Sequence, residues 1–299
     1  MKKTVIYIAG GGMSGVFGCG VMMTLQEKSA YPMIKAVYGA SAGAMDGAYF
    51  LARELEVGAS IYFNEARVGF IDLKKLWPGF MYLRKHGPIY PVHPDHYINV
   101  MHVDYLMDVV ANKRKLDTTM LLKQPIPFYV KVLNQHTHQV EYLNIKRYDP
   151  LKVLRATISM PPLTFSYELL HHNRMVDSCI AEVIGAKYLL EKHKNDKVVV
   201  IVNRRPPPLN IVGRFLCKAE AYAGTRMYGQ HYHDFPLARE RRFAAEIEML
   251  KQYKNVKLIM PPRSSQSKPQ TTNLAKLKKT YALGRRAGER VWEFMSEET

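Results

Sequence analysis

The sequence predicts an α/β fold, in which a mainly parallel central sheet lies between two layers of helices. Over the first 56 residues, β-branched and aromatic runs alternate with helical patterns in the order strand, helix, strand, helix. Further apolar runs at 126–133 and 197–203 suit strands that are buried on both faces. The chain has 299 residues, of which 47% are hydrophobic, so it is long enough to build a large core.

The expected elements alternate simply up to residue 56 and become less regular after it. Strands are expected at 4–9 and 34–38, helices at 15–28 and 42–55, a helical and irregular insert at 57–125, and a helix within that insert at 103–111. Next come strands at 126–133 and 138–145 around a turn at 134–137, a helix at 150–158, a strand ending near 176, a helix at 178–192, and a strand at 197–203. The tail adds a helix at 237–253, a strand at 256–260, a polar loop at 264–272 and a last helix.

The strand at 256–260 suits the edge of the same sheet, so we expect a single domain over 1–299. Its core motifs lie in 3–56 and 126–204, and a helix-strand-helix unit at 237–296 completes it. The last helix carries the basic amphipathic stretch AKLKKTYALGRRAGERVWEF, which suits either a solvated helix face or contact with an anionic surface.

The formal net charge of +17 favours an anionic partner, but the charge is spread along the chain and no block resembles a nucleic-acid-binding arm. Three widely separated cysteines, Cys19, Cys179 and Cys217, indicate neither a disulfide framework nor a metal motif. No stretch reaches the roughly 18 apolar residues of a membrane-spanning helix. We therefore expect a cytoplasmic protein that meets an anionic membrane only at its periphery and binds no nucleic acid.

The segment VIYIAGGGMSGVFGCG carries Gly10, Gly12 and Gly15 between the first strand and its helix. This G-x-G-x-x-G pattern is typical of a loop that binds the pyrophosphate of a dinucleotide. Such a site also needs an acidic residue at the end of the second strand, and the sequence there, VYGAS, has none. No GK[ST] follows for a Walker loop. A nucleotide-binding protein is thus an alternative that lacks one of its expected residues.

The end of the second strand carries Gly39-Ala40-Ser41-Ala42-Gly43, a G-x-S-x-G pattern between a strand and a helix. This pattern is typical of a nucleophile elbow, in which the glycines permit a sharp turn that exposes the serine. The alternative is a tight turn in which Ser41 only caps the helix. The glycine loop on the adjacent strand favours the nucleophile, because its amides can stabilise an oxyanion beside the serine. A triad of the α/β-hydrolase type is not expected, since Ser41 follows only two strands.

Together these motifs resemble the patatin-like phospholipase family of the bacterial cytoplasmic kind. Residues 10–15, GGGMSG, are similar to the family's glycine loop, and YGASAGAMDGAYF resembles its serine motif. Asp177 in RMVDSC, which follows LRATISMPPLTF, resembles its aspartate motif. The resemblance covers 3–56 and 150–204 at the level of motifs. Two positions differ: Ser14 replaces the basic residue of the loop, and Ser178-Cys179 replaces the glycine pair after the aspartate.

The resemblance implies a serine acyl-hydrolase that cleaves carboxylic esters of lipids through a Ser-Asp dyad, with no metal or cofactor. Ser41 would attack the ester carbonyl, Asp177 would accept or steer its proton, and water would hydrolyse the acyl-enzyme. The oxyanion hole would come from Gly10, Gly11, Gly12 and Met13, and the elbow glycines would be Gly39 and Gly43. Asp177 also suits the N-cap of the following helix. A non-catalytic patatin-like protein that binds lipid or a partner is a further alternative.

Other polar and aromatic side chains are expected to be mainly structural. His171 and His172 suit an exposed turn, and Asp46 suits a polar helix position near the site. Two loose histidine groups are not expected to bind metal; they are His93, His96 and His102, and His231 and His233 with Asp234. The aromatic and Met-rich insert suits ordinary core, an acyl pocket or a lipid-facing lid; its members are Phe63, Phe70, Trp77, Phe80, Met81 and Tyr82.

Overall fold

A computed structural model describes residues 3–86, 99–265 and 267–297, and these residues form one eight-stranded sheet. The strands are β1 (Thr4–Ile8), β2 (Ile34–Ala40), β3 (Phe128–Asn134), β4 (Val140–Asn144), β5 (Glu168–Leu170), β6 (Asn173–Asp177), β7 (Lys197–Ile201) and β8 (Val256–Ile259). Their order is β5-β6-β3-β2-β1-β7-β8, and β4 pairs with β3 outside this path. The strands from β3 through β2, β1 and β7 to β8 are parallel, whereas β4, β5 and β6 pair antiparallel.

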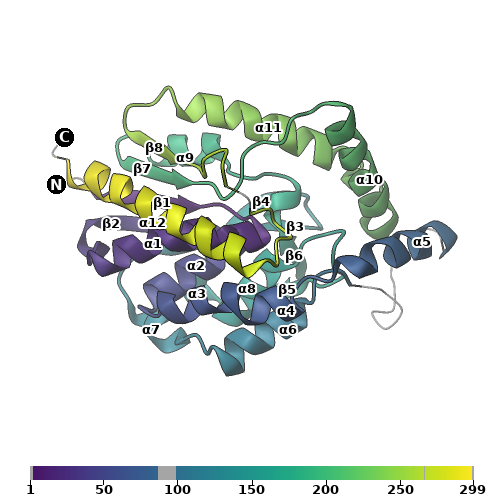
Figure 1. The fold of residues 1–299 in the computed structure, drawn as a ribbon, viewed down its shortest axis with the longest axis horizontal. Helices are drawn as coiled ribbons and strands as arrows, with labels where there is room; N and C mark the ends of the chain where they lie inside the picture. The colour runs from purple at the N-terminus through teal and green to yellow at the C-terminus, as the bar shows by residue number, and fades with distance from the viewer. Residues whose placement is uncertain (1–2, 87–98, 266, 298–299) are drawn as a thin grey trace.

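Helices cover both faces of this sheet, so the predicted three-layer α/β/α architecture is confirmed (Figure 1). The helices are α1 (Val16–Glu27), α2 (Ala42–Leu51), α3 (Leu55–Phe63), α4 (Glu65–Gly69), α5 (Leu76–His86), α6 (Val103–Asp108), α7 (Thr118–Lys123), α8 (Pro150–Ile158), α9 (Ala186–Lys192), α10 (Ile211–Tyr228), α11 (Phe235–Leu250) and α12 (Leu274–Ser296). Ile6 and Ile8 of β1 pack with α1, α2 and α12 on one face. Val5 and Tyr7 alternate with them and pack with α9 and α11 on the other face.

The carboxyl ends of β2 and β6 meet along the same edge of β3. Ala40, the last residue of β2, pairs with Lys131 of β3. Asp177, the last residue of β6, pairs with Val132, the next residue of β3. Strand β4 occupies the opposite edge of β3 over the same residues, so β2 and β6 must share the remaining edge. Because β2 and β6 run in opposite directions, their carboxyl ends meet.

Two of the expected helices are broken in the structure. The helix expected at 42–55 ends at Leu51, and α3 then folds back onto α2 with Gly58 directly against the ring of Tyr49. The helix expected at 178–192 is a short 3₁₀ turn over Ser178–Ile180 followed by α9, because Gly185 adopts a left-handed φ of 83° between them. Residues 211–228, which carry no prediction, form the long helix α10.

The last helix is a packed element rather than a free amphipathic tail. Its buried face, which includes Leu277, Val291 and Met295, lies against the core, and its basic residues face outward. The backbones of α12 and α1 approach closely at Gly284 and Gly20: a Cβ at Gly284 would lie 2.1 Å from the carbonyl oxygen of Phe17. The solvated-face interpretation of this segment therefore agrees with the packing. No helix within the described residues is long and apolar enough to cross a bilayer.

Candidate active site

Ser41 occupies a sharp turn between β2 and α2, with φ of 51° and ψ of −127°. A serine seldom adopts a positive φ, and such strain is concentrated at functional sites. Both flanking glycines are sterically required: a Cβ at Gly39 would lie 2.6 Å from the Cα of Ala44, and one at Gly43 would lie 2.3 Å from the carbonyl oxygen of Ile8. The Ser41 side chain makes no capping hydrogen bond to α2. The turn thus has the geometry of an elbow, not that of a serine N-cap.

Asp177 lies beside Ser41 because the two strand ends meet on β3. Its side chain is almost fully buried, at 1% exposed, whereas Ser41 is 8% exposed. Burial raises the pKa of the Asp177 carboxyl, while a side-chain interaction with the Ser41 hydroxyl lowers it. Asp177 also accepts a hydrogen bond of 2.8 Å from the backbone amide of Cys179, so it caps the short turn at Ser178–Ile180 as well. The Asp177 side chain therefore lies beside Ser41 and caps the short turn at the same time.

The glycine loop lies against Ser41 through Gly10, where a Cβ would come within 2.9 Å of the Ser41 Cβ. No acceptor for the amides of Gly11 and Gly12 is found among the residues that the structure describes. The Met13 amide, by contrast, donates to the carbonyl oxygen of Pro269 at 2.8 Å. Of the four expected oxyanion donors, Met13 is therefore already engaged by the C-terminal loop, whereas the amides of Gly10, Gly11 and Gly12 have no acceptor among the described residues.

Ser14 has a structural explanation in this loop. It is fully buried, and its hydroxyl donates to the carbonyl oxygen of Gly11 at 2.7 Å. Asn203 holds the other side of the loop: its side-chain amide donates to the carbonyl oxygen of Ala9 at 2.6 Å, and its side-chain oxygen accepts from the amide of Gly18 at 2.8 Å. The loop is therefore fixed by neutral hydrogen bonds, and the side chain of Ser14 carries no charge toward the site.

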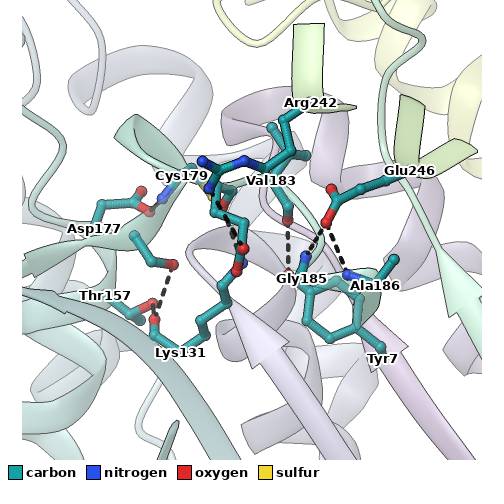
Figure 2. Close-up of polar contacts among 12 residues, drawn as sticks. Tyr7, Lys131, Thr157, Asp177, Cys179, Val183, Gly185, Ala186, Arg242 and Glu246 are labelled. Carbon is teal, nitrogen blue, oxygen red and sulfur yellow. Dashed lines mark hydrogen bonds and ion pairs between the residues drawn. The ribbon is translucent and has the colours of Figure 1, made fainter. Parts of the chain in front are cut away.

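A buried polar network that includes Thr157 and Lys131, drawn in Figure 2, supports the elbow from the β3 side. Thr157 accepts a hydrogen bond of 2.8 Å from the Ser41 amide and donates one of 2.8 Å to the carbonyl oxygen of Lys131. The Lys131 side chain is fully buried and forms an ion pair of 3.0 Å with Glu182. Its positive charge lowers the pKa of Asp177 and thereby offsets part of the burial effect.

This network was not predicted from the sequence, although the sequence contains one signal of it. Lys131 is a single charged residue in the otherwise apolar strand FYVKVL. A lysine in a buried strand must be paired, so it marks a polar network. Glu246 belongs to the same region: it accepts hydrogen bonds from the amides of Gly185 (3.0 Å) and Ala186 (2.8 Å), and it fixes the turn before α9 (Figure 2).

Ser41 lies where an inner cavity meets an outer groove. The inner cavity, of about 50 Å³, is lined mostly by apolar side chains such as Met45, Ile61 and Phe70. The groove, of about 600 Å³, is also lined by Asp177 and passes between α5 and α10. Both hollows share Gly12, Ser41 and Met101 in their walls. An ester carbonyl at Ser41 could therefore have an apolar chain on one side and a larger group on the other.

Asp46 lies on the wall of the inner cavity and not at the reacting end of the site. One carboxyl oxygen accepts a hydrogen bond of 3.1 Å from the Tyr62 hydroxyl, and the other has no partner among the described residues. Burial raises the pKa of this carboxyl well above its ordinary value. The expectation of a polar helix position near the site agrees with this placement.

The aromatic insert serves several purposes. Phe70 lines the inner cavity, Phe80 lines the groove, and Phe63 packs against Tyr281 with ring centroids 5.5 Å apart. Trp77, in contrast, is 70% exposed. Some aromatic side chains of this segment therefore belong to the hydrophobic core, whereas others line the inner cavity or the groove.

Among the residues that the structure describes, no histidine is a hydrogen-bond partner of Ser41 or Asp177. His171 and His172 form the exposed turn between β5 and β6, as expected. His102 lies 3.1 Å from the Lys75 ammonium, whereas His93 and His96 fall outside the described residues. His233 pairs with Asp234 at 2.9 Å, and the His231 ring stacks on His138. In the described part of the chain no three His, Cys, Asp or Glu side chains gather as metal ligands.

Comparisons with known proteins give distant similarities of structure. No model of a known protein family matches the sequence, and no curated protein matches it. Among solved structures, the chain is similar to VipD from Legionella pneumophila, with 15% identity and a TM-score of 0.49 over 98% of this chain and 67% of that one. It is also similar to the type III effector protein ExoU, with 12% identity and a TM-score of 0.41 over 99% of this chain and 54% of that one. The chain thus spans about half the length of ExoU, and these similarities assign it to no family.

Proposed function

We propose that this protein is a serine acyl-hydrolase of the patatin-like phospholipase type, which cleaves carboxylic esters of lipids. The observation that carries the proposal is the strained Ser41 elbow beside the buried Asp177. Strain of this kind persists only where the surrounding structure holds it, and here the Thr157 hydroxyl and the elbow glycines do so. An elbow, a buried acid and unpaired amides on the adjacent loop are the parts that acyl transfer requires.

In the proposed reaction, the Ser41 hydroxyl oxygen attacks the ester carbonyl carbon while Asp177 accepts the hydroxyl proton. The amides of Gly11 and Gly12 stabilise the resulting oxyanion, and each such donor typically contributes about 3 kcal/mol. Collapse of the tetrahedral intermediate expels the alcohol, which takes the proton back from Asp177, and leaves an acyl group on Ser41. Water then attacks the acyl-enzyme with Asp177 as base, which releases the carboxylic acid and restores Ser41.

The surroundings of Ser41 favour a lipid ester over a small polar ester. The inner cavity is apolar and suits the start of an acyl chain. The outer groove is larger and mixed in character, because Arg204 and Glu240 line one part of it and Leu76 and Phe80 another. Such a groove suits the remainder of an amphipathic ester.

Labelling with a fluorophosphonate tests the proposal most directly. The wild-type protein should label covalently, and Ser41→Ala should not, because the probe reacts only with an activated serine. Asp177→Asn should label at least about a hundredfold more slowly, since a positioned base typically contributes that much. Ser60→Ala, which removes a serine hydroxyl bonded to the carbonyl oxygen of Val57, is the matched control and should label normally.

Two results would contradict the proposal. Equal labelling of wild type and Ser41→Ala, or absence of labelling in both, would favour a non-catalytic lipid- or partner-binding protein. Saturable binding of NAD or ATP, lost on substitution in the 10–15 loop, would instead support the nucleotide-binding alternative.

A further inference from the structure

We propose that helices α5 and α10 form a surface that docks on an anionic lipid bilayer and delivers lipid esters to the groove. This α5–α10 face is defined by the exposed residues of α5, of α10 and of the 3₁₀ turn before α5; they are Leu73, Leu76, Trp77, Ile211, Phe215 and Leu216. The inference rests on the proposed function for the identity of the delivered ester. The docking itself is independent of catalysis.

Both helices expose large apolar side chains that a water-soluble surface normally buries. Trp77 is 70% exposed, Phe215 is 68% exposed and Ile211 is 88% exposed. Single exposed apolar residues are common on proteins, but a cluster of this size on two neighbouring helices marks an interaction site. The two helices lie side by side (Figure 1) and touch through the rings of Phe80 and Tyr222, whose centroids are 5.6 Å apart. Leu76 of α5 and Leu216 of α10, both exposed, line the same groove, so the exposed residues of the two helices adjoin one another there.

The positive charge around these exposed apolar residues favours an anionic partner. Lys74, Arg84, Lys85, Arg214 and Lys218 are exposed on the two segments. Residues 73–86 and 211–228 contain one acidic residue, Glu220, and this residue is paired with Arg239 at 2.6 Å. Large apolar side chains interleaved with unopposed cations are typical of a surface that enters the interface of an anionic membrane.

The α5–α10 face lies beside the groove that leads to Ser41. Leu76 and Phe80 of α5 line the groove on one side, and Leu216 of α10 lines it on another. The same groove reaches Ser41 and Asp177. A bilayer held against the α5–α10 face would therefore lie at the open end of the groove, and a lipid could pass between the helices without crossing water.

The test uses the full chain carrying Ser41→Ala, so that lipid is bound and not hydrolysed, and Trp292→Phe. The chain contains two tryptophans, so Trp77 is then the only one and its fluorescence reports on the face. Vesicles of phosphatidylcholine mixed with phosphatidylglycerol should shift Trp77 emission to the blue and sediment the protein. Vesicles of phosphatidylcholine alone should bind much more weakly, and added salt should weaken binding to the anionic vesicles.

Two pairs of variants localise the effect. Lys74→Glu with Lys218→Glu should weaken vesicle binding by at least about thirtyfold, because each lost cation contributes about fivefold and the anionic surface also repels each new carboxylate. Lys278→Glu with Lys279→Glu changes the net charge equally but lies on α12, and it should retain most of the affinity. Phe215→Ser should weaken binding about tenfold. Tyr253→Ser, which truncates another exposed ring, should not.

Several outcomes would overturn the proposal. One is absence of vesicle binding, and another is equal weakening by the α12 charge reversal. A blue shift of Trp77 that depends on protein concentration and needs no lipid would show that the face joins two copies of this chain. Hydrolysis of a soluble short-chain ester should be unchanged in Phe215→Ser. Loss of vesicle binding with intact ester hydrolysis separates this proposal from the proposed chemistry.

Discussion

Ser41 adopts a backbone conformation that glycine tolerates better than serine does. The conformation is maintained by its surroundings: the amide is bonded to Thr157, and the chain on either side is packed through glycines. The strain points the hydroxyl toward the groove that Asp177 lines. The strained backbone of Ser41 costs stability, and the same backbone conformation exposes the Ser41 side chain to the groove.

This trade-off predicts that Ser41→Gly is more stable than Ser41→Ala by about 1 kcal/mol, as measured by urea unfolding. Both variants lose the hydroxyl and its interaction with Asp177, so the comparison isolates the backbone. Relief of a positive φ is worth about 1–3 kcal/mol, and the extra flexibility of unfolded glycine offsets part of it. Equal stability, or a more stable Ser41→Ala, would contradict the strained elbow.

Burial of Asp177 and the charge of Lys131 both affect the pH at which Asp177 can act as a base. The carboxyl must be ionised to accept a proton, and burial raises its pKa while the Lys131 charge lowers it. Activity of the proposed enzyme should therefore fall as the pH drops through the raised pKa of Asp177. Lys131→Met should move this acid limb of kcat/KM to higher pH, because the pKa rises further without the cation.

The pH profile separates this positioning role from general destabilisation. Lys131→Arg keeps the charge beside Glu182 and should leave the acid limb near its wild-type position. Lys131→Met should also unfold more easily, by about 1 kcal/mol, because Glu182 loses Lys131 and keeps only its longer ion pair of 3.7 Å with Arg242. A variant that loses activity equally at all pH values would argue that Lys131 acts only through stability.

At the scale of elements, the contact between α1 and α12 depends on glycine. A Cβ at Gly284 would lie 2.1 Å from the Phe17 carbonyl oxygen, and one at Gly20 would lie 2.4 Å from that of Tyr281. Neither backbone can yield without separating the helices. The hydroxyl of Thr24 also donates to the carbonyl oxygen of Arg285 at 3.0 Å across this contact.

We predict that Gly284→Ala destabilises the protein by about 2 kcal/mol, as measured by the midpoint of thermal or urea unfolding. The clash with a backbone oxygen exceeds the gain in helix propensity of about 1 kcal/mol. Gly224→Ala in α10 is the matched control, because its nearest neighbouring atom would be 3.4 Å away. That variant should be neutral or stabilised. A stabilised Gly284→Ala would mean that the helices are not in close contact.

Element prediction succeeded where the apolar pattern points inward and failed where it does not. Strands β1, β2, β3 and β7 and helix α1 follow buried runs, and they lie close to where the sequence predicts them, whereas the short strand β5 was not predicted. Helix α10 was missed because its large apolar side chains, such as Phe215, face outward while small residues such as Ala221 are buried. The breaks at Arg53 and Gly185 depend on positive φ values, which follow from tertiary contacts such as those of Gly58 and Glu246.

At the scale of the whole molecule, the sequence identified the residues of the candidate site but not what holds them together. Ser41 and Asp177 were predicted from motifs, whereas their proximity results from the register of β2 and β6 on β3. The hydrogen bonds that join Ser41 to Thr157 and Thr157 to Lys131 connect residues far apart in the sequence, so no local sequence pattern could predict them. The bond between Met13 and Pro269 was likewise invisible, because it joins opposite ends of the chain.

That last bond has a consequence for the order in which the protein is made. The glycine loop and Ser41 leave the ribosome well before Pro269 and α12 do. Until then α1 lacks the helix that packs on it, and the Met13 amide lacks its acceptor. A nascent chain therefore carries Ser41 long before the loop beside it is complete, and the proposed hydrolase would become active only after Pro269 and α12 have emerged.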